Sequence, residues 1–322
     1  MAPGRSPSRV LVAGGAGFLG AHLIAVRLGR GDVVHVLVRP TTDLARLARF
    51  GDAITVHPLA LTDRAAVDRA VAAACPDSVF HLAVGDRRAM RPNLADALGS
   101  VDDDLAGLLV LLAACAAAAR PPQVFVRAGS LAEYGPIAAP YEETQREHPE
   151  SAYAAGQVAA SHYMAMLGPR LPFAAVTARL ALVYGPGQSQ RFLLPGLIEH
   201  CLAGEPSRIA RSGDRRDLIH VDDAIAGLEA LAARPEAPVV NICTGIAPAM
   251  ADVAALVCEA TGADPRLVEL ATASAQGGVP DLRGSGALAR RVCRWSAQIP
   301  LAEGIARTVQ WHRVRARQVE TC

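Results

Sequence analysis

The fold of this 322-residue chain is decided by one stretch near its start, Val10-Leu11-Val12-Ala13-Gly14-Gly15-Ala16-Gly17-Phe18-Leu19-Gly20. It is an apolar run that leads into a glycine turn, and the turn opens a stretch of helix-forming residues. The three spaced glycines allow a tight turn, close approach of a pyrophosphate and close packing of the helix on the strand. Phosphate is also bound well by the free N–H groups of a helix N-terminus. The sequence therefore predicts a dinucleotide site whose phosphate end is formed by Gly14, Gly17, Phe18, Leu19 and Gly20.

Downstream of this stretch, short β-branched runs alternate with longer runs rich in Ala and Leu, which is the pattern of repeated βαβ units. Strands are expected near residues 10–13, 33–38, 54–57, 77–83, 123–128 and 174–181. Helices are expected near residues 18–30, 63–74, 102–119 and 152–168. The predicted fold class is α/β, a Rossmann-type doubly wound parallel sheet. The apolar residues 101–120 can pack either on this sheet or on a partner subunit.

After Tyr184 the pattern changes, because Pro and Gly punctuate the chain at 185–187, 195–196 and 204–206. This change predicts a smaller C-terminal substrate-binding lobe. We expect residues 1–183 to form the dinucleotide-binding domain and residues 184–322 to form mainly the substrate-binding lobe. Segments near 217–243 contain strand-like runs, and they are expected to return to the first domain.

Composition narrows the classes of function. The net charge is +1, so no long-range field favours nucleic acid or an anionic membrane. No apolar run reaches the roughly 18 residues that a membrane span needs, and no leader is evident, so a cytoplasmic location is expected. The seven cysteines lack the paired spacing of a metal site, and no metal is predicted. All 32 basic residues are arginine, and lysine is absent from the chain.

The end of the second expected strand bears on the choice of cofactor. It reads Val36-Leu37-Val38-Arg39, without the acid that usually accepts hydrogen bonds from the ribose of NAD. Arg39 can instead pair with a 2′-phosphate, which favours NADP, although NAD stays possible. The alternative is that Arg39 is simply a solvated side chain at a strand end.

These features, taken in order, resemble the extended short-chain dehydrogenase/reductase family, which includes nucleotide-sugar epimerases, dehydratases and 4-ketoreductases. The resemblance covers nearly the whole chain. It rests on the glycine spacing and on five further stretches: Phe80-His81-Leu82-Ala83, Ser130 to Gly135, Tyr153 to Gln157, Arg179 to Gly187, and Arg216 to Asp223. It implies that Leu82 and Ala83 bind the cofactor.

The resemblance also implies the catalytic residues Ser130, Tyr153 and Gln157. Tyr153 would exchange a proton with the substrate oxygen while the nicotinamide exchanges a hydride with the adjoining carbon, and Ser130 would hold that oxygen. The family has a lysine where this chain has Gln157. That lysine binds the nicotinamide ribose and lowers the pKa of the tyrosine by its charge, whereas a glutamine provides only the hydrogen bond. An arginine, or a histidine such as His162, would have to supply the charge.

The missing charge affects alcohol oxidation and ketone reduction unequally. A tyrosine with a pKa of about 10 is a poor base near neutral pH but a usable acid, so ketone reduction suffers less than alcohol oxidation. This favours a reductase over an epimerase, and it leaves a non-redox role open. A 4,6-dehydratase is disfavoured, because Leu131 and Ala132 stand where that branch has an Asp-Glu pair, and Glu133 lies one residue later.

For the substrate, the resemblance implies that Arg216 binds a diphosphate. A second arginine of the family is absent, since Ala275-Gln276-Gly277-Gly278 stands in its place, and Arg283 is the nearby substitute. Arg191 and Phe192 either contact the phosphate and base or are a loop arginine and a core phenylalanine. Of the other motif residues, His220 is expected to make a structural hydrogen bond, and Asp222 and Asp223 to be a helix N-cap and a first-turn acid.

The expected function is therefore that of an NADPH-dependent ketoreductase acting on a nucleotide-linked 4-keto-6-deoxysugar in secondary metabolism. The alternatives are an NAD-dependent nucleotide-sugar 4-epimerase and a cofactor-binding protein with a non-redox role. A homodimer is expected, because residues 102–119 and 152–168 correspond to the helices that relatives pair into a four-helix bundle.

Overall fold

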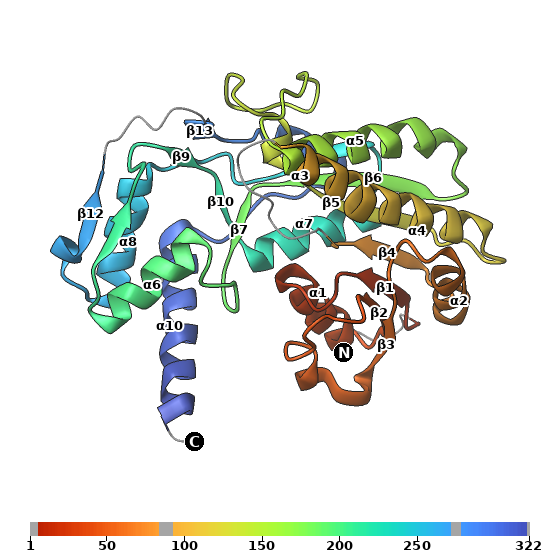
Figure 1. Cartoon of the computed structure of the whole chain (residues 1–322), viewed down its shortest axis with the longest axis horizontal. Coiled ribbons are helices and arrows are strands. Elements are labelled where there is room, and N and C mark those ends of the chain that lie inside the picture. The colour runs from red at the N-terminus through yellow and green to blue at the C-terminus, as the bar shows by residue number, and fades with distance from the viewer. Residues whose placement is uncertain (1–5, 84–92, 272–277, 321–322) are drawn as a thin grey trace.

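The computed structural model describes residues 6–83, 93–271 and 278–320 (Figure 1). Its centre is a seven-stranded parallel sheet in the order β11-β6-β5-β4-β1-β2-β3. The strands are β1 (Arg9–Ala13), β2 (Val33–Val38), β3 (Ile54–Pro58), β4 (Ser78–His81), β5 (Val124–Ser130), β6 (Ala174–Leu180) and β11 (Val239–Ile242). The predicted Rossmann-type fold is confirmed, and all six expected strands are present. The direction of chain progression reverses between β1 and β4, which is where such sheets bind ligands.

Helices cover both faces of the sheet (Figure 1). One face carries α1 (Phe18–Gly29), α7 (Val221–Ala233) and α9 (Ala287–Cys293), and the other carries α2 (Arg64–Ala74), α4 (Ala106–Ala117) and α5 (Ala152–Leu167). Alternate residues of β1 serve the two faces: Val10 and Val12 pack under α1, while Leu11 and Ala13 pack on the opposite side. A strand buried on both faces explains why β1 reads as a continuous apolar run.

The helix expected at 102–119 is longer and less regular than the sequence indicated. It starts as α3 (Leu94–Gly99), passes through the π-helical turn η2 (Ser100–Leu105) and continues as α4. Asn93 caps its start by accepting a hydrogen bond from Asp96 N at 2.8 Å. The neighbouring helix α5 passes very close to η2, since a Cβ on Gly156 would lie 2.0 Å from Ser100 Oγ. Glycine at that position permits this contact.

A second apolar cluster, separate from the sheet, lies in the C-terminal part of the chain. It is formed by α6 (Leu193–Ala203), α8 (Met250–Thr261) and α10 (Leu301–Glu320), together with the paired strands β8 (Ser207–Ile209) and β12 (Val268–Leu270). Figure 1 shows these elements to one side of the sheet. Two further pairs join β7 (Leu182–Tyr184) to β10 (Leu218–His220) and β9 (Arg215–Arg216) to β13 (Asp281–Leu282).

Only part of the region 217–243 returns to the large sheet. Strand β11 pairs with β6 at the edge of this sheet, whereas β10 pairs with β7 outside it.

The remaining short turns are η1 (Ala48–Ala53), η3 (Leu131–Glu133), η4 (Gly168–Arg170) and η5 (Pro265–Leu267). Within the described residues, none of the helices has both the length and the apolar character needed to cross a bilayer.

Candidate active site

The glycine turn between β1 and α1 has the geometry that the sequence predicted. Gly14 has φ +81°, and a Cβ there would lie 2.6 Å from Ala83 N. A Cβ on Gly20 would lie 2.4 Å from Gly14 O, and one on Gly17 would lie 3.1 Å from the same atom. The N-cap of α1 is Gly17, which has no side chain to occupy the helix N-terminus. The first N–H groups of α1 are therefore available for a phosphate.

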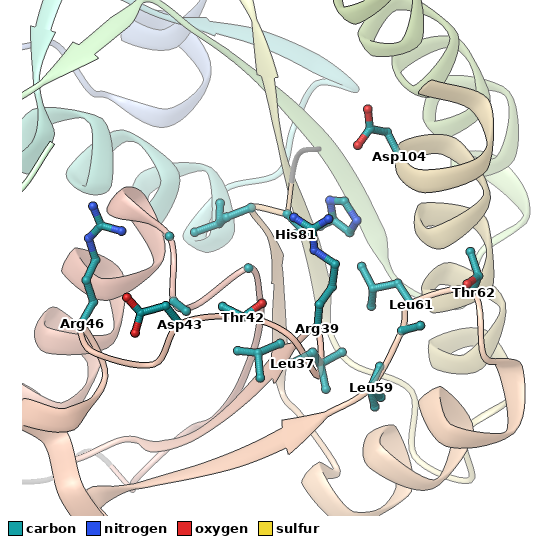
Figure 2. A pocket seen from close by; sticks show the side chains of 17 residues that line it. Leu37, Arg39, Thr42, Asp43, Arg46, Leu59, Leu61, Thr62, His81 and Asp104 are labelled. Carbon is teal, nitrogen blue, oxygen red and sulfur yellow. The ribbon is translucent and has the colours of Figure 1, made fainter. Parts of the chain in front are cut away.

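A cavity of about 370 Å³ opens beside this turn, at the carboxyl ends of β1 to β4 (Figure 2). The predicted cofactor residues Gly14, Gly17, Arg39, Leu82 and Ala83 line it. Phe18, Leu19 and Gly20 lie in the first turn of α1 and are not among its lining residues, nor are Tyr153 and Gln157. A glycine cradle, a free helix N-terminus and a crevice at the switch point of the sheet fit a dinucleotide.

The cavity has walls that sequence reasoning missed. They are Leu59 to Thr62 after β3, Thr42, Asp43 and Arg46 after β2, His81 on β4, and Asp104 on η2. Figure 2 shows Arg46 and Asp43 on one side of the cavity and Leu61 and Thr62 on the other. Their position in the sequence could have identified them, because the segments that follow parallel strands meet at one edge of a sheet.

The residues that follow β2 give this cavity charges of both signs. Arg39 and Arg46 are exposed cations, and Arg46 also donates to Gly187 O at 3.1 Å. Asp43 lies between them in the sequence, and its Oδ1 accepts from Ala45 N at 2.8 Å. The strand end itself has no acid, as predicted, but the carboxylate of Asp43, five residues after the end of β2, lines the cavity. Cations suit a 2′-phosphate, whereas a carboxylate suits free ribose hydroxyls.

His81 closes the inner side of the cavity as a neutral, buried group. Burial lowers its pKa to about 3, and the nearby Arg127 acts in the same direction. Among the described residues, no hydrogen-bond partner reaches its Nε2. A buried polar atom without a partner at a cavity wall fits a site that binds a polar ligand.

Ser130 and Tyr153 lie on adjoining elements at the carboxyl edge of the sheet. Ser130 ends β5 and caps η3, where its Oγ accepts from Ala132 N at 3.1 Å, so its hydroxyl proton can still be donated. Tyr153 lies in the first turn of α5, just after the N-cap Ser151, and is partly exposed. Gln157 lies one turn further along the same helix face and is only 3% exposed. Their catalytic roles stay predictions.

A buried arginine, Arg127 on β5, occupies the space behind Gln157. It donates to the side-chain Oε1 of Gln157, to the backbone oxygen of Gln157 at 3.3 Å and to Ser161 Oγ at 3.1 Å. His162, the histidine considered as a source of charge, instead lies on the exposed side of α5 with its Nε2 3.3 Å from Glu147 Oε2. The cation nearest to position 157 is therefore Arg127, which the sequence did not single out.

Glu133 is turned away from the site. It is fully buried; its Oε1 accepts from Ser130 N at 3.0 Å, and its Oε2 accepts from Ser161 Oγ at 2.7 Å and Arg179 Nε at 2.8 Å. Arg179 also binds Glu147. These contacts use Glu133 to fix η3 against β6 and α5, so its carboxylate is not free to act on a substrate.

The predicted diphosphate residues lie close together: Arg216 ends β9, and Arg283 directly follows β13, the strand that pairs with β9. Arg216 binds Asp214 at 2.6 Å, and Arg283 binds Asp281 at 3.1 Å. Residues 275–277, where the second family arginine is missing, lie outside the described residues. In the loop before α6, Arg191 is exposed, and Phe192 is the partly buried N-cap residue.

The helix start at 220–223 differs in detail from the prediction. His220 is the N-cap of α7, and its Nδ1 accepts from Asp222 N at 3.3 Å, so its structural hydrogen bond is present. The assignment of Asp222 as the N-cap is wrong, because Val221 is already helical and Asp222 lies in the first turn. Asp223 accepts from Gln298 N and Ile299 N at 3.0 and 2.8 Å, and thereby holds the segment before α10.

Comparison with known proteins places this geometry in context. The model of the NAD dependent epimerase/dehydratase family matches residues 10–243. UDP-glucose 4-epimerase of Mycolicibacterium smegmatis is 28% identical, covering 96% of this chain and 100% of the relative. The dTDP-6-deoxy-L-talose 4-dehydrogenase (NAD(P)(+)) of Kitasatospora kifunensis is 29% identical over 84% of each chain. The structure of Thermus thermophilus UDP-glucose 4-epimerase in complex with NAD has a TM-score of 0.83 and 28% identity, covering 95% of this chain and 99% of that one.

Proposed function

Because this chain belongs to the NAD-dependent epimerase/dehydratase family, we propose that it is an NADPH-dependent ketoreductase of a nucleotide-linked 4-keto-6-deoxysugar. The observation that carries this proposal is the pair of arginines, Arg39 and Arg46, in the wall of the dinucleotide cavity. Two cations in the segment after β2, beside which we place the adenosine end of the cofactor, suit the 2′-phosphate of NADPH. NADPH is a reductant that must be exchanged at every turnover, which a reductase requires and an epimerase does not.

In the proposed reaction the substrate carbonyl lies between Ser130 and Tyr153. When bound, the nicotinamide supplies the hydride that adds to the carbonyl carbon. Ser130 donates a hydrogen bond to the carbonyl oxygen, and Tyr153 gives up its phenolic proton to that oxygen as negative charge develops there. Arg216 and Arg283 bind the substrate diphosphate, exchanging part of their contacts with Asp214 and Asp281 for phosphate oxygens.

A 4-epimerase is the second candidate, favoured by Asp43 in the same cavity and by epimerases that align with the chain over nearly its whole length. Asp43 would accept hydrogen bonds from the free ribose hydroxyls of NAD. An epimerase must first oxidise its substrate, and it then reduces the intermediate with the same cofactor molecule. It therefore keeps its NAD tightly bound and needs no added reductant.

The test is to identify the nucleotide that copurifies with the protein and then to assay two reactions. A ketoreductase consumes NADPH with a dTDP-linked 4-keto-6-deoxysugar, and Tyr153→Phe slows that consumption by about a hundredfold or more. An epimerase releases NAD on denaturation and interconverts UDP-glucose and UDP-galactose without added reductant, which would refute the reductase proposal. Protein that binds NADPH but oxidises it with none of a panel of keto sugars would indicate the non-redox role.

We also propose that the chain forms a two-fold dimer through α3 and α5. These elements lie side by side and expose large apolar side chains: Leu94 (83% exposed), Leu98 (65%), Val101 on η2 (53%), Tyr163 (41%) and Met166 (50%). A patch of this kind on adjacent helices suits an isologous helix-bundle interface.

A further inference from the structure

Position 157 carries no charge of its own, yet a buried cation lies directly behind it. We propose that Arg127 acts through Gln157 as a positioning residue, supplying the positive charge that stabilises deprotonated Tyr153 and turning the Gln157 amide group toward the cofactor ribose. This inference rests on the proposed function only in taking Tyr153 as the group that exchanges the proton.

The orientation of the Gln157 amide follows from the chemistry of its partner. Arg127 donates to the Gln157 side chain, and a guanidinium carries donors only. The amide oxygen must therefore face Arg127, which leaves Nε2 on the opposite side of the amide with two protons to donate. Further bonds from Arg127 to Ser161 Oγ at 3.1 Å and to the Gln157 backbone oxygen at 3.3 Å fix the guanidinium. A donor group backed by a fixed positive charge matches what a lysine would present.

The charge also acts on Tyr153. Tyr153 lies four residues before Gln157, so the two side chains share one face of α5. Burial lowers the pKa of Arg127, while Glu133, Tyr153 and Asp104 raise it. Coulomb interaction is mutual, so the cation that tyrosinate stabilises also stabilises tyrosinate. An opposite charge within about 4–6 Å lowers the pKa of an acid by about 1 to 3 units. We expect the lower figure here, because the hydrogen bonds of Arg127 go to Gln157 and Ser161.

Other ionisable groups surround Arg127, and among their charges that of Glu133 acts on it most strongly. They are Glu133 on η3, Arg179 on β6, Asp104 on η2 and His81 on β4, with Glu147 and His162 beyond Arg179. The hydrogen bonds of Arg127 end on uncharged oxygens. Glu133 is reached only through Ser161, and its own ion pair is with Arg179 at 2.8 Å. His81 is neutral because of its lowered pKa.

Titration of tyrosinate absorbance tests the proposal without any substrate. Burial raises the pKa of Tyr134 and Tyr141 to about 12, and it raises that of Tyr184 further, so these three ionise late. The difference between the wild type and Tyr153→Phe isolates Tyr153. We expect its midpoint to lie below the ordinary value of about 10. A midpoint at or above that value overturns the proposal, and this result needs no Arg127 variant to fold.

Four variants then assign the source of the charge. Arg127→Met should raise the Tyr153 midpoint by about one pH unit. The charge-retaining Arg127→Lys and the double variant Arg127→Met/Gln157→Lys should return it close to the wild-type value. Ser161→Ala removes a contact of Arg127 without removing charge, so it should leave the midpoint nearly unchanged. An unshifted midpoint in folded Arg127→Met, or a midpoint in Arg127→Lys that equals that of Arg127→Met, would overturn the proposal.

The titration tests the role of Arg127 independently of the test of the proposed function. If the titration behaves as expected but no keto sugar is reduced, the reductase assignment fails while the Arg127 inference stands. If sugars are reduced but Arg127→Met leaves the Tyr153 midpoint unmoved, the reductase stands and the inference fails.

Discussion

Placing a lysine at position 157 should destabilise this protein, because the new ammonium would meet Arg127. Gln157 is buried and within hydrogen-bond reach of the guanidinium. Two unit charges about 4 Å apart repel by about 4 kcal/mol at an effective dielectric constant of about 20. That is a large share of the roughly 5 to 15 kcal/mol that stabilises a typical protein. The same repulsion would lower the pKa of the introduced lysine by about 3 units, from about 10.4 to about 7.5.

The sign of the pH dependence follows from this lowered pKa. Between about pH 7.5 and 10.4 the folded Gln157→Lys protein binds fewer protons than its unfolded chain, so its stability rises with pH. The deficit is therefore complete below about pH 7.5 and disappears above the unfolded pKa of about 10.4. Urea unfolding followed by circular dichroism at pH 7 and pH 9.5 measures it.

Matched variants separate charge from shape in this experiment. Gln157→Met loses the amide hydrogen bond but adds no charge, so its smaller deficit should not change with pH. Arg127→Met/Gln157→Lys holds a single cation, so it should recover most of the stability lost in Gln157→Lys at pH 7. If Gln157→Lys and Gln157→Met show equal deficits at both pH values, Arg127 does not lie where the structure places it.

The remaining predictions concern the donor, the cofactor, the turn and the dimer. Tyr153→Phe should slow hydride transfer by about a hundredfold or more, as loss of a positioned acid does; an unchanged rate of NADPH consumption would point to another acid. Arg39→Ala should weaken calorimetric binding of NADPH by about 10- to 100-fold and leave NADH nearly unaffected; equal losses for both would exclude a 2′-phosphate contact. Gly20→Ala places its Cβ 2.4 Å from a carbonyl of the turn and should abolish dinucleotide binding, whereas Gly29→Ala, with nothing within 4 Å, should not. Leu98→Arg should convert the dimer to a monomer in light scattering, and a monomeric wild type would contradict the interface.

The sequence predicted those parts of the fold that depend on residues lying close together in the chain. The glycine turn is one, because each spaced glycine fulfils a requirement within a single βα unit. The strands are another, since burial on both faces demands continuous apolar runs such as Val10 to Ala13. The role of His220 also followed from local sequence, although its helix begins two residues earlier than expected, at Val221.

The features that sequence did not reveal depend on contacts between distant segments. Arg127 precedes Gln157 by 30 residues, and their contact exists because β5 packs under α5. An arginine inside the apolar run Val124 to Ala128 was a usable signal, since a charge in a buried strand needs partners. The turn at Ser100–Leu105 had no such signal, and its close contact with α5 at Gly156 is visible only in the structure. Asp43 reaches the cavity because of the path of the chain after β2.

Arg127 changes which observation must distinguish a reductase from an epimerase. From the sequence, the absence of a lysine penalised alcohol oxidation and so disfavoured an epimerase. If Arg127 stabilises deprotonated Tyr153 as proposed, the pKa of Tyr153 falls by about one unit, and the penalty on oxidation falls by about tenfold. The chemistry of Tyr153 then serves both directions. The distinction moves to the adenosine end of the cavity, where Arg39 and Arg46 favour an exchangeable NADPH and Asp43 favours a retained NAD. Exchanging these charges, rather than altering the catalytic tyrosine, is therefore the change that should shift this protein between the two functions.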